Sequence, residues 1–443
     1  MTDAAIAILG AGMAGMAAAR SLRDLDCMVY EAGRHPGGHA SSFRIEKSFL
    51  FDEGPHVSFT GEERIQRFLA RSVDDRYSEF PALATNYFQG SILKHPVQCN
   101  LHGVSTEIIT RCIVEFVAAQ QAPKGPIETY KDWCYQQLGA GISELFTRQY
   151  TRKYWNRELE QLTADWVSQR IYAPHLEEVV RGALSRQTGD HYYLSQFRYP
   201  LENGFGAYNT LLQRDMRVAC NMRAQELDLQ QKQIFFENGA SAHYEQLISS
   251  MPLPELVRLC RDVPSAVREA AAQLACTSHF LLSLGIARPQ VSDASWSYFY
   301  DEEIPFSRAS FPSKFSPDNA PAGHCSIQLE VVHSRFKPIP GYDYLIEQCL
   351  DSLIKLGLLH GKEEIVALDA RDIQYANVIF DLHRAPNVAL LHDFLWRNDV
   401  RCCGRYGEWA YLWSDQAMLS GERAANEVRE LLHRAARCFD DES

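Results

Sequence analysis

The sequence has no long hydrophobic run, no Cys-x-x-Cys pair and no excess of basic residues. Its most apolar run, residues 280–287, is far shorter than the roughly 18 apolar residues that span a bilayer, so we expect no transmembrane segment. Lys and Arg number 44 against 56 Asp and Glu, and the net charge of −12 argues against a nucleic-acid-binding surface. An anionic ligand is not excluded, because arginines can gather locally in an acidic protein.

Several other signals are also missing. No basic stretch precedes an apolar segment at the start of the sequence, so we expect no signal peptide and a cytoplasmic protein. The 12 cysteines are scattered, and we expect them to be reduced thiols. We find no Ser-His-Asp arrangement and no metal-ligand spacing, so we expect no metal site.

Length and composition indicate more than one domain. With 443 residues, of which 46% are apolar, the chain can form two or more domains of about 150 residues each. We expect a discontinuous nucleotide-binding α/β domain from residues 1–65, 199–265 and 370–436. Two insertions would form the rest, a mainly helical part at 66–198 and a β-rich sheet at 266–369.

Hydrophobic periodicity gives the expected elements. The first segment should form a strand at 4–9, a tight turn, a helix at 13–25 and a strand at 27–31. Residues 63–184 should be mainly helical, most clearly at 130–148 and 164–171. Further strands are expected at 233–237, 247–251, 388–391 and 400–403, with a hairpin turn at Asn238-Gly239. The last element should be a long helix from Asp415 to about residue 436.

The opening turn carries a glycine motif, Gly10-x-Gly12-x-x-Gly15, directly after the first strand. Gly10 allows the tight turn, Gly12 lets the backbone approach a pyrophosphate, and Gly15 allows close helix–strand packing. Met13 and Ala14 would then present the helix N-terminus to the phosphates. Glu31, followed by Ala32, ends the second strand about 20 residues later, where a carboxylate binds the ribose hydroxyls.

Two later segments indicate which cofactor the protein binds. Gly37-Gly38-His39 follows the second strand, and Gly404-Arg405 precedes Ser414-Asp415-Gln416 at the start of the last helix. This combination resembles the FAD-binding fold of amine oxidases, protoporphyrinogen oxidases, phytoene desaturases and UDP-galactopyranose mutases. The resemblance implies FAD, with the last helix directed at the flavin. The expected fold is therefore α/β, a discontinuous FAD-binding Rossmann-like domain of the glutathione-reductase type with an inserted helical and mixed-sheet substrate domain.

Four segments are similar to UDP-galactopyranose mutase, at residues 54–60, 93–97, 150–155 and 304–308. The resemblance implies that His56 lies beside the flavin and that Arg170 and Arg308 bind a diphosphate. It also implies substrate contacts from Tyr154, Trp155, Tyr192 and Tyr411. Asn156 and Arg157 stand where the mutase has glycine, and the surroundings of Tyr411 differ. These departures affect the expected identity of the sugar more than the expected binding of the diphosphate. A diphosphate is well bound by arginine, whose planar guanidinium donates two parallel hydrogen bonds.

The leading hypothesis is a mutase-like enzyme of polysaccharide biosynthesis that acts on a nucleotide-diphosphate sugar, with UDP as the expected nucleotide. In that chemistry, N5 of reduced flavin attacks the anomeric carbon in a redox-neutral ring contraction, so NAD(P)H or another reductant is needed only to reduce the flavin. One alternative is a net oxidoreductase of the amine oxidase or protoporphyrinogen oxidase type. A second is a non-catalytic escort-type protein with the same fold. The sequence leaves a homodimer open.

Overall fold

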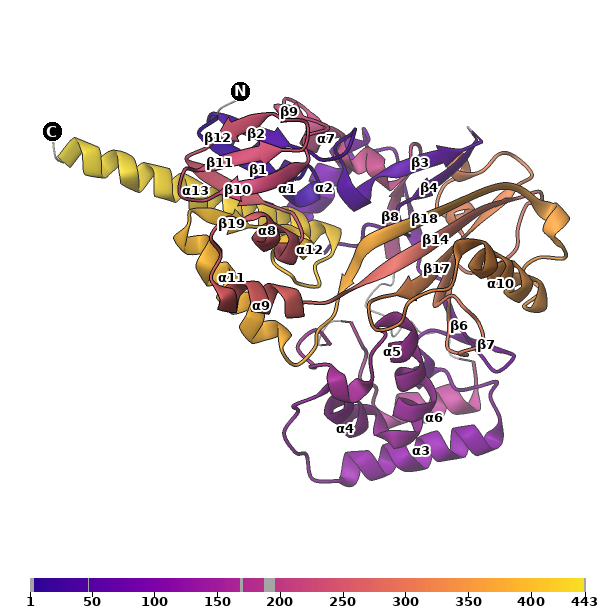
Figure 1. Ribbon diagram of the computed structural model, residues 1–443. Helices are drawn as coiled ribbons and strands as arrows, with labels where there is room; N and C mark the ends of the chain where they lie inside the picture. Colours follow the sequence, from indigo (N-terminus) through magenta and orange to yellow (C-terminus); the bar gives the residue numbers. More distant parts are fainter. Residues whose placement is uncertain (1–3, 47, 168–169, 187–195, 442–443) are drawn as a thin grey trace.

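The computed structural model describes residues 4–46, 48–167, 170–186 and 196–441 (Figure 1). Its first sheet is parallel and is buried on both faces. In the first strand, Ile6 and Ile8 join one hydrophobic core while Ala7 and Leu9 join another, because successive side chains of a strand point to opposite faces. The strand order is β19 (Val400–Cys402), β13 (Gln246–Ser249), β1 (Ile6–Leu9), β2 (Cys27–Tyr30) and β9 (Val218–Ala219).

Helices and a small antiparallel sheet cover this parallel sheet. One core is shared with α1 (Met13–Ser21), α2 (Glu63–Ser72), α7 (Thr210–Gln213) and α13 (Ser414–Asp441). The other includes α8 (Leu253–Leu259), α9 (Ser265–Gln273), α11 (Arg384–Arg397) and the small sheet of β10 (Ala224–Asp228), β11 (Gln233–Phe236) and β12 (Ser241–His243). Figure 1 shows the end of α13 projecting from the body of the molecule.

A mixed seven-stranded sheet forms the second large layer, and α10 (Tyr342–Lys355) packs into its core. In order, its strands are β18 (Ile365–Val378), β14 (Cys276–Ile286), β17 (Cys325–His333), β16 (Arg308–Ser310), β15 (Trp296–Phe299), β6 (Ala84–Phe88) and β7 (Ser91–Lys94). Two strand pairs accompany it, β3 (Ser42–Ile45) with β4 (Phe49–Asp52) and β5 (Tyr77–Pro81) with β8 (Gln196–Pro200).

The helical part lies below the seven-stranded sheet in Figure 1. It contains α3 (Thr106–Gln121), α4 (Tyr130–Ile142), α5 (Arg148–Tyr154) and α6 (Leu176–Leu184). The short helix α12 (Gly404–Gly407) precedes α13 at the other side of the molecule. In the described ranges, no helix combines the length and apolar composition needed to cross a membrane.

The α/β fold is confirmed, and the strand–turn–helix–strand start lies where the sequence predicts it. Two local predictions are wrong. Residues 388–391 lie inside α11, where Val388, Leu391 and Leu395 form its buried side at helical spacing. The described part of 164–171 forms turns instead of a helix, with Trp166 Nε1 donating to the carbonyl of Thr163.

Residues 63–184 are less helical than expected, because β5, β6 and β7 lie inside this stretch. The strands of the parallel sheet come from separated parts of the chain, before residue 31, between 218 and 249, and at 400–402. The proposed domain limits themselves stay a prediction.

Candidate cofactor and substrate site

A large cavity lies between the parallel sheet and the seven-stranded sheet. Its volume is about 1420 Å³, above the roughly 300–1,000 Å³ of ordinary small-molecule pockets. Its lining extends from Glu31, next to β2, to Arg308 on β16. The cavity therefore has room for a dinucleotide and a further ligand.

Two glycine segments meet at one wall of this cavity. The Gly37 N–H donates to the carbonyl of Ala11 at 2.8 Å, and a short parallel bridge joins Gly12 to Gly37. Gly10 needs its freedom because its φ is 94°. No side chain caps the start of α1 at Gly12, and Gly12, Met13 and Ala14 all line the cavity. The N-terminal dipole of α1 is thus open to an anion.

Glu31 fixes the turn from the side. One carboxylate oxygen accepts from the Ala11 N–H at 2.7 Å, and the other accepts from the Gly33 N–H at 2.6 Å. Each oxygen keeps a further lone pair, because a carboxylate offers about four acceptor positions. Glu31 also lines the cavity, so it can accept from a sugar hydroxyl.

The end of the chain returns to the same wall. α13 packs so closely on α1 that a β-carbon on Gly421 would clash with the carbonyl oxygen of Ala14. Ser414, at the start of α13, lines the cavity. The Gly404 N–H donates to the Ser420 hydroxyl at 2.8 Å, which holds α12 against α13. The first and last helices therefore begin at one cavity.

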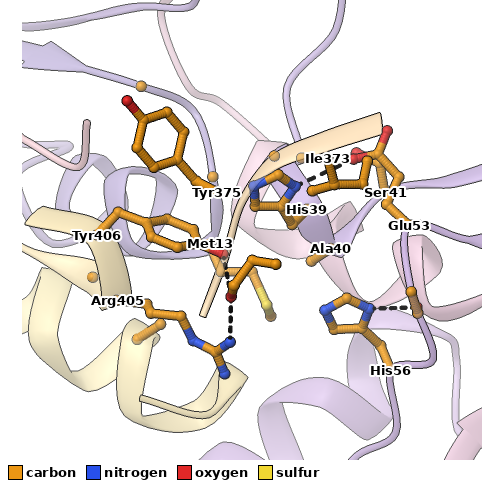
Figure 2. Close-up of a pocket in the computed structure, with 18 of the residues that line it drawn as sticks. Met13, His39, Ala40, Ser41, Glu53, His56, Ile373, Tyr375, Arg405 and Tyr406 are labelled. Carbon is orange, nitrogen blue, oxygen red and sulfur yellow. Dashed lines mark hydrogen bonds and ion pairs between the residues drawn. The ribbon is translucent and has the colours of Figure 1, made fainter. Parts of the chain in front are cut away.

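His39 and His56 line this cavity from the segments after β2. Nδ1 of His39 lies 3.4 Å from the Glu53 carboxylate, as Figure 2 shows. Nδ1 of His56 lies 2.8 Å from the carbonyl oxygen of Gly54, so it must donate its proton there. His56 Nε2 is then an acceptor, and burial lowers the pKa of His56 to about 4, which keeps the ring neutral at neutral pH.

Arg308 lines the far part of the cavity with two tyrosines. Its Nε and Nη2 both lie near one oxygen of Glu330, at 2.8 and 2.6 Å. Tyr154 and Tyr411 also line the cavity, and their hydroxyls form a hydrogen bond of 3.0 Å. The guanidinium of Arg170 stacks on the Tyr411 ring at 3.6 Å and donates to the Tyr411 carbonyl.

Arg405 is anchored differently. Its Nε donates to the carbonyl of Leu412 at 2.8 Å, and Nη1 donates to the carbonyl of Ala376 at 3.1 Å and to Asn377 Oδ1 at 3.2 Å. It lies beside Tyr406 in Figure 2. Arg405 thus ties α12 to β18 and presents a cation at the cavity wall.

Comparisons with known proteins agree with this architecture. Residues 8–72 match the model of an NAD(P)-binding Rossmann-like domain. A crystal structure of reduced UDP-galactopyranose mutase matches with a TM-score of 0.91 and 26% identity, over 97% of this chain and 94% of that one. The fold is that of the FAD-dependent amine oxidase-like superfamily.

Other proteins match at lower identity. A protein assigned as a protoporphyrinogen oxidase, from an Exiguobacterium species, gives a TM-score of 0.73 at 15% identity, over 96% of this chain and 98% of that one. Cyclohexylamine oxidase from Brevibacterium oxydans gives 0.69 at 13%, over 97% and 100%. A probable UDP-galactopyranose mutase from Klebsiella pneumoniae is 24% identical over 176 residues, 37% of this chain but only 44% of that protein's length.

FAD is the cofactor of this flavoenzyme, and the cavity fits it. Protein packing does not explain Gly12, because a β-carbon there would meet only Gly38 Cα, at 3.9 Å. The missing side chain leaves the backbone open toward the cavity, as a pyrophosphate requires. Bound FAD would be held by the N-terminus of α1, by Glu31 at a ribose and by the segment Gly37-Gly38-His39.

Most of the predicted site residues line the cavity. They are Gly10, Gly12, Met13, Ala14, Glu31, Ala32, Gly37, Gly38, His39, His56, Tyr154, Arg308, Gly404, Arg405, Tyr411 and Ser414. Gly15, Trp155, Arg170, Asp415 and Gln416 do not line it. A β-carbon on Gly15 would clash with the Gly10 carbonyl oxygen, and Gln416 Oε1 accepts from the Trp413 N–H. Gly15 and Gln416 therefore stabilise the backbone next to the cavity without lining it.

Arg170 was expected on a helix, but it follows a turn in which its N–H donates to the carbonyl of Val167. It lies behind Tyr411 instead of in the cavity lining, so its predicted grip on a diphosphate stays a prediction. Trp155 packs edge-on against the same tyrosine. Tyr192 lies outside the described residues. Within those residues, no group of three or more His, Cys, Asp and Glu side chains could hold a metal ion.

His279 and Glu330 are among the lining residues that the sequence patterns did not predict. Both lie in strands of the seven-stranded sheet, close to Arg308. A signal was available in β17, where Ser326, Gln328 and Glu330 alternate with apolar residues and so share one face. A polar face on a fully buried strand indicates a site or a polar network.

Proposed function

We propose that this flavoenzyme interconverts the pyranose and furanose forms of a nucleotide-diphosphate sugar, as a UDP-galactopyranose mutase does. The observation that carries the proposal is the shared cavity, in which Arg308, Tyr154 and Tyr411 lie together with the dinucleotide cradle. The mutase likeness over nearly the whole chain supports it. The sugar and the nucleotide base are proposed by that likeness alone.

Reduced FAD, when bound, would supply the nucleophile for the anomeric carbon. The chain's own residues then have binding and charge roles. Arg308 would balance negative charge on the departing diphosphate, and the Tyr154–Tyr411 pair would donate to its oxygens. His56 would accept a hydrogen bond at Nε2, since its Nδ1 proton is held by Gly54.

A reductant is also part of the proposal. NAD(P)H or another donor in the cytoplasm would reduce the flavin once, and turnover would then consume no further electrons. This feature separates the proposal from net redox chemistry.

Anaerobic turnover tests the proposal directly. Dithionite-reduced holoenzyme is incubated with UDP-galactopyranose and, in parallel, with UDP-glucose, and products are separated by ion-exchange chromatography. We expect a furanose product only with reduced enzyme, in amounts far above the enzyme concentration. Product formed by the oxidised enzyme alone would contradict the proposal.

The second candidate is a net oxidoreductase of the amine oxidase or protoporphyrinogen oxidase type. Its support is the aromatic part of the cavity lining, which includes Trp296, Tyr298 and Trp413. Substrate-dependent bleaching of oxidised flavin, followed by oxygen consumption, would favour it. FAD and membership among these enzymes set aside the escort-type alternative.

A further inference from the structure

Arg308 is paired with a carboxylate that solvent does not reach. Arg308 and Glu330 are direct partners in the register of β16 and β17. The Glu330 side chain is 0% exposed and that of Arg308 is 22% exposed. The carboxylate thus lies behind the guanidinium, and the guanidinium faces the cavity.

The hydrogen bonds of this pair fix the orientation of the arginine. Nε donates to Oε1 of Glu330 at 2.8 Å, and Nη2 forms an ion pair with the same oxygen at 2.6 Å. An arginine has five N–H donors, so those on the edge of the guanidinium away from this oxygen remain for a ligand. A single carboxylate oxygen therefore turns one edge of Arg308 inward and leaves the other for a ligand.

The second oxygen of Glu330 faces a neutral histidine. Oε2 has no hydrogen-bond partner among the described residues, and Nδ1 of His279 lies 3.6 Å away. His279 Nε2 lies 3.2 Å from the amide of Asn377. Burial lowers the pKa of His279 to about 3, so this ring adds no charge at neutral pH.

The groups that contact Arg308 directly are consequently close to neutral in sum, and Arg405 is a separate cation of the cavity wall. The charges of Arg308 and Glu330 cancel, and His279 is uncharged. Burial raises the pKa values of Tyr150 and Tyr154 well above the usual range, so these neighbouring phenols are uncharged as well. An anion that docks on Arg308 meets an oriented donor group with little net attraction.

We propose that Glu330 is a positioning residue that orients Arg308 toward a phosphate group and weakens the hold of the site on the free anion. The proposal rests on the proposed function, in which a diphosphate must leave the sugar and return. Without the carboxylate, the arginine in this poorly solvated site would attract the leaving group more strongly and so slow its release.

Two consequences distinguish this role from simple packing. Removing the charge of Glu330 should tighten anion binding, because Arg308 is then uncompensated. Removing Arg308 alone should weaken binding by more than the loss of its own contacts, because a buried carboxylate is left facing the phosphates. Replacing both should restore part of the loss.

Calorimetric titration of the oxidised holoprotein with UDP and with inorganic pyrophosphate tests both consequences. We expect Glu330→Gln to bind each anion about tenfold more tightly than wild type. We expect Arg308→Ala with Glu330→Gln to bind at least about fivefold more tightly than Arg308→Ala alone. In turnover, Glu330→Gln should lower KM and also kcat, a split that a packing defect would not give.

Glu53→Gln is the matched control. Glu53 lines the same cavity, but its carboxylate lies near His39 and Arg371, at 3.4 and 4.0 Å. Its removal takes the same charge from the lining without touching Arg308. Anion affinity should stay within about twofold of wild type.

Equal or weaker anion binding by Glu330→Gln overturns the inference. If this variant does not fold with FAD, Arg308→Lys provides the test, because lysine keeps the charge but cannot reproduce the oriented fork. Its pyrophosphate affinity should fall at least about tenfold, and unchanged affinity overturns the inference. If the wild type does not bind UDP but the variants change pyrophosphate affinity as expected, only the proposed function is refuted. If the wild type binds neither anion, the proposed function and this inference are both refuted.

Discussion

At the residue scale, Glu31 holds two backbone turns with one carboxylate. Replacing it by alanine removes the bonds to the Ala11 and Gly33 N–H groups and the acceptor for a ribose hydroxyl. Hydrogen bonds to a charged group contribute about 1.5–3 kcal/mol, so we expect FAD affinity to fall roughly 10- to 100-fold. Fluorescence titration of the apoprotein with FAD measures this change.

Glu269→Gln is the control for that prediction, because Glu269 is exposed on α9. Its FAD affinity should match wild type. Equal FAD affinity in Glu31→Ala would mean that the carboxylate only supports the loop.

Three histidines with lowered pKa values predict how stability depends on pH. Burial lowers the pKa to about 4 for His56 and to about 3 for His95 and His279. The unfolded chain binds protons at these positions below about pH 6.5, whereas the native chain does not, so stability is present above that pH and is lost as the pH falls. As the pH falls from about 6.5 toward the pKa of the folded protein, each histidine lowers the free energy of unfolding by about 1.4 kcal/mol per pH unit.

Asp52 acts in the opposite direction. Burial raises the pKa of Asp52 to about 6, so its protonated form favours the native state below that pH. One carboxyl offsets only part of the effect of three histidines. The urea midpoint of unfolding should therefore be lower at pH 5.5 than at pH 7.5, and an equal or higher midpoint at pH 5.5 would refute this balance.

A larger share of the residues predicted for the cofactor than of those predicted for the substrate lines the cavity. Gly10, Gly12 and Glu31 lie within one strand–turn–helix–strand unit, so their spacing alone sets their geometry. Glu330 reaches Arg308 only through the pairing of two strands, 22 residues apart in the chain. Such register is decided by the whole sheet and could not be derived from either strand alone.

At the element scale, the contact of α1 with α13 is the tightest constraint on the cofactor wall. A β-carbon on Gly421 would clash with the Ala14 carbonyl oxygen, so Gly421→Ala should force the two helices apart. Alanine gains about 1 kcal/mol of helix propensity, but overpacking of a close contact costs about 1–3 kcal/mol. We expect a lower melting temperature by differential scanning calorimetry and weaker retention of FAD.

Gly341→Ala is the matched control. Gly341 precedes α10 with a φ of −55°, and a β-carbon there would meet nothing within 4 Å. Its melting temperature should stay close to wild type. A Gly421→Ala protein as stable as this control, with normal FAD content, would mean that α13 does not fix the cofactor wall.

Short apolar runs explain the wrong element predictions. Residues 388–391 are read equally well as a buried strand or as one side of a helix, and only the following Leu395 extends the helical spacing. In the segment after α5, the Leu162 carbonyl accepts from the Tyr130 N–H at the start of α4, and the Thr163 N–H donates to the Phe380 carbonyl, so tertiary contacts decide its path. Neither contact leaves a local pattern in the sequence.

At the scale of the whole molecule, one cavity joins parts of the chain that are far apart in sequence. The opening turn supplies the phosphate cradle, the start of the last helix lies beside it, and the seven-stranded sheet supplies Arg308. The central claim is that bound FAD and a diphosphate occupy this cavity together. An anion on Arg308 should then change the surroundings of the flavin.

Titration of the oxidised holoprotein with UDP, followed by the visible absorption of its flavin, tests that claim most directly. We predict a saturable shift of the flavin bands in wild type, and the same shift only at a much higher UDP concentration in Arg308→Ala. UDP binding that calorimetry detects without any change in the flavin spectrum, and with equal affinity in Arg308→Ala, would contradict the claim.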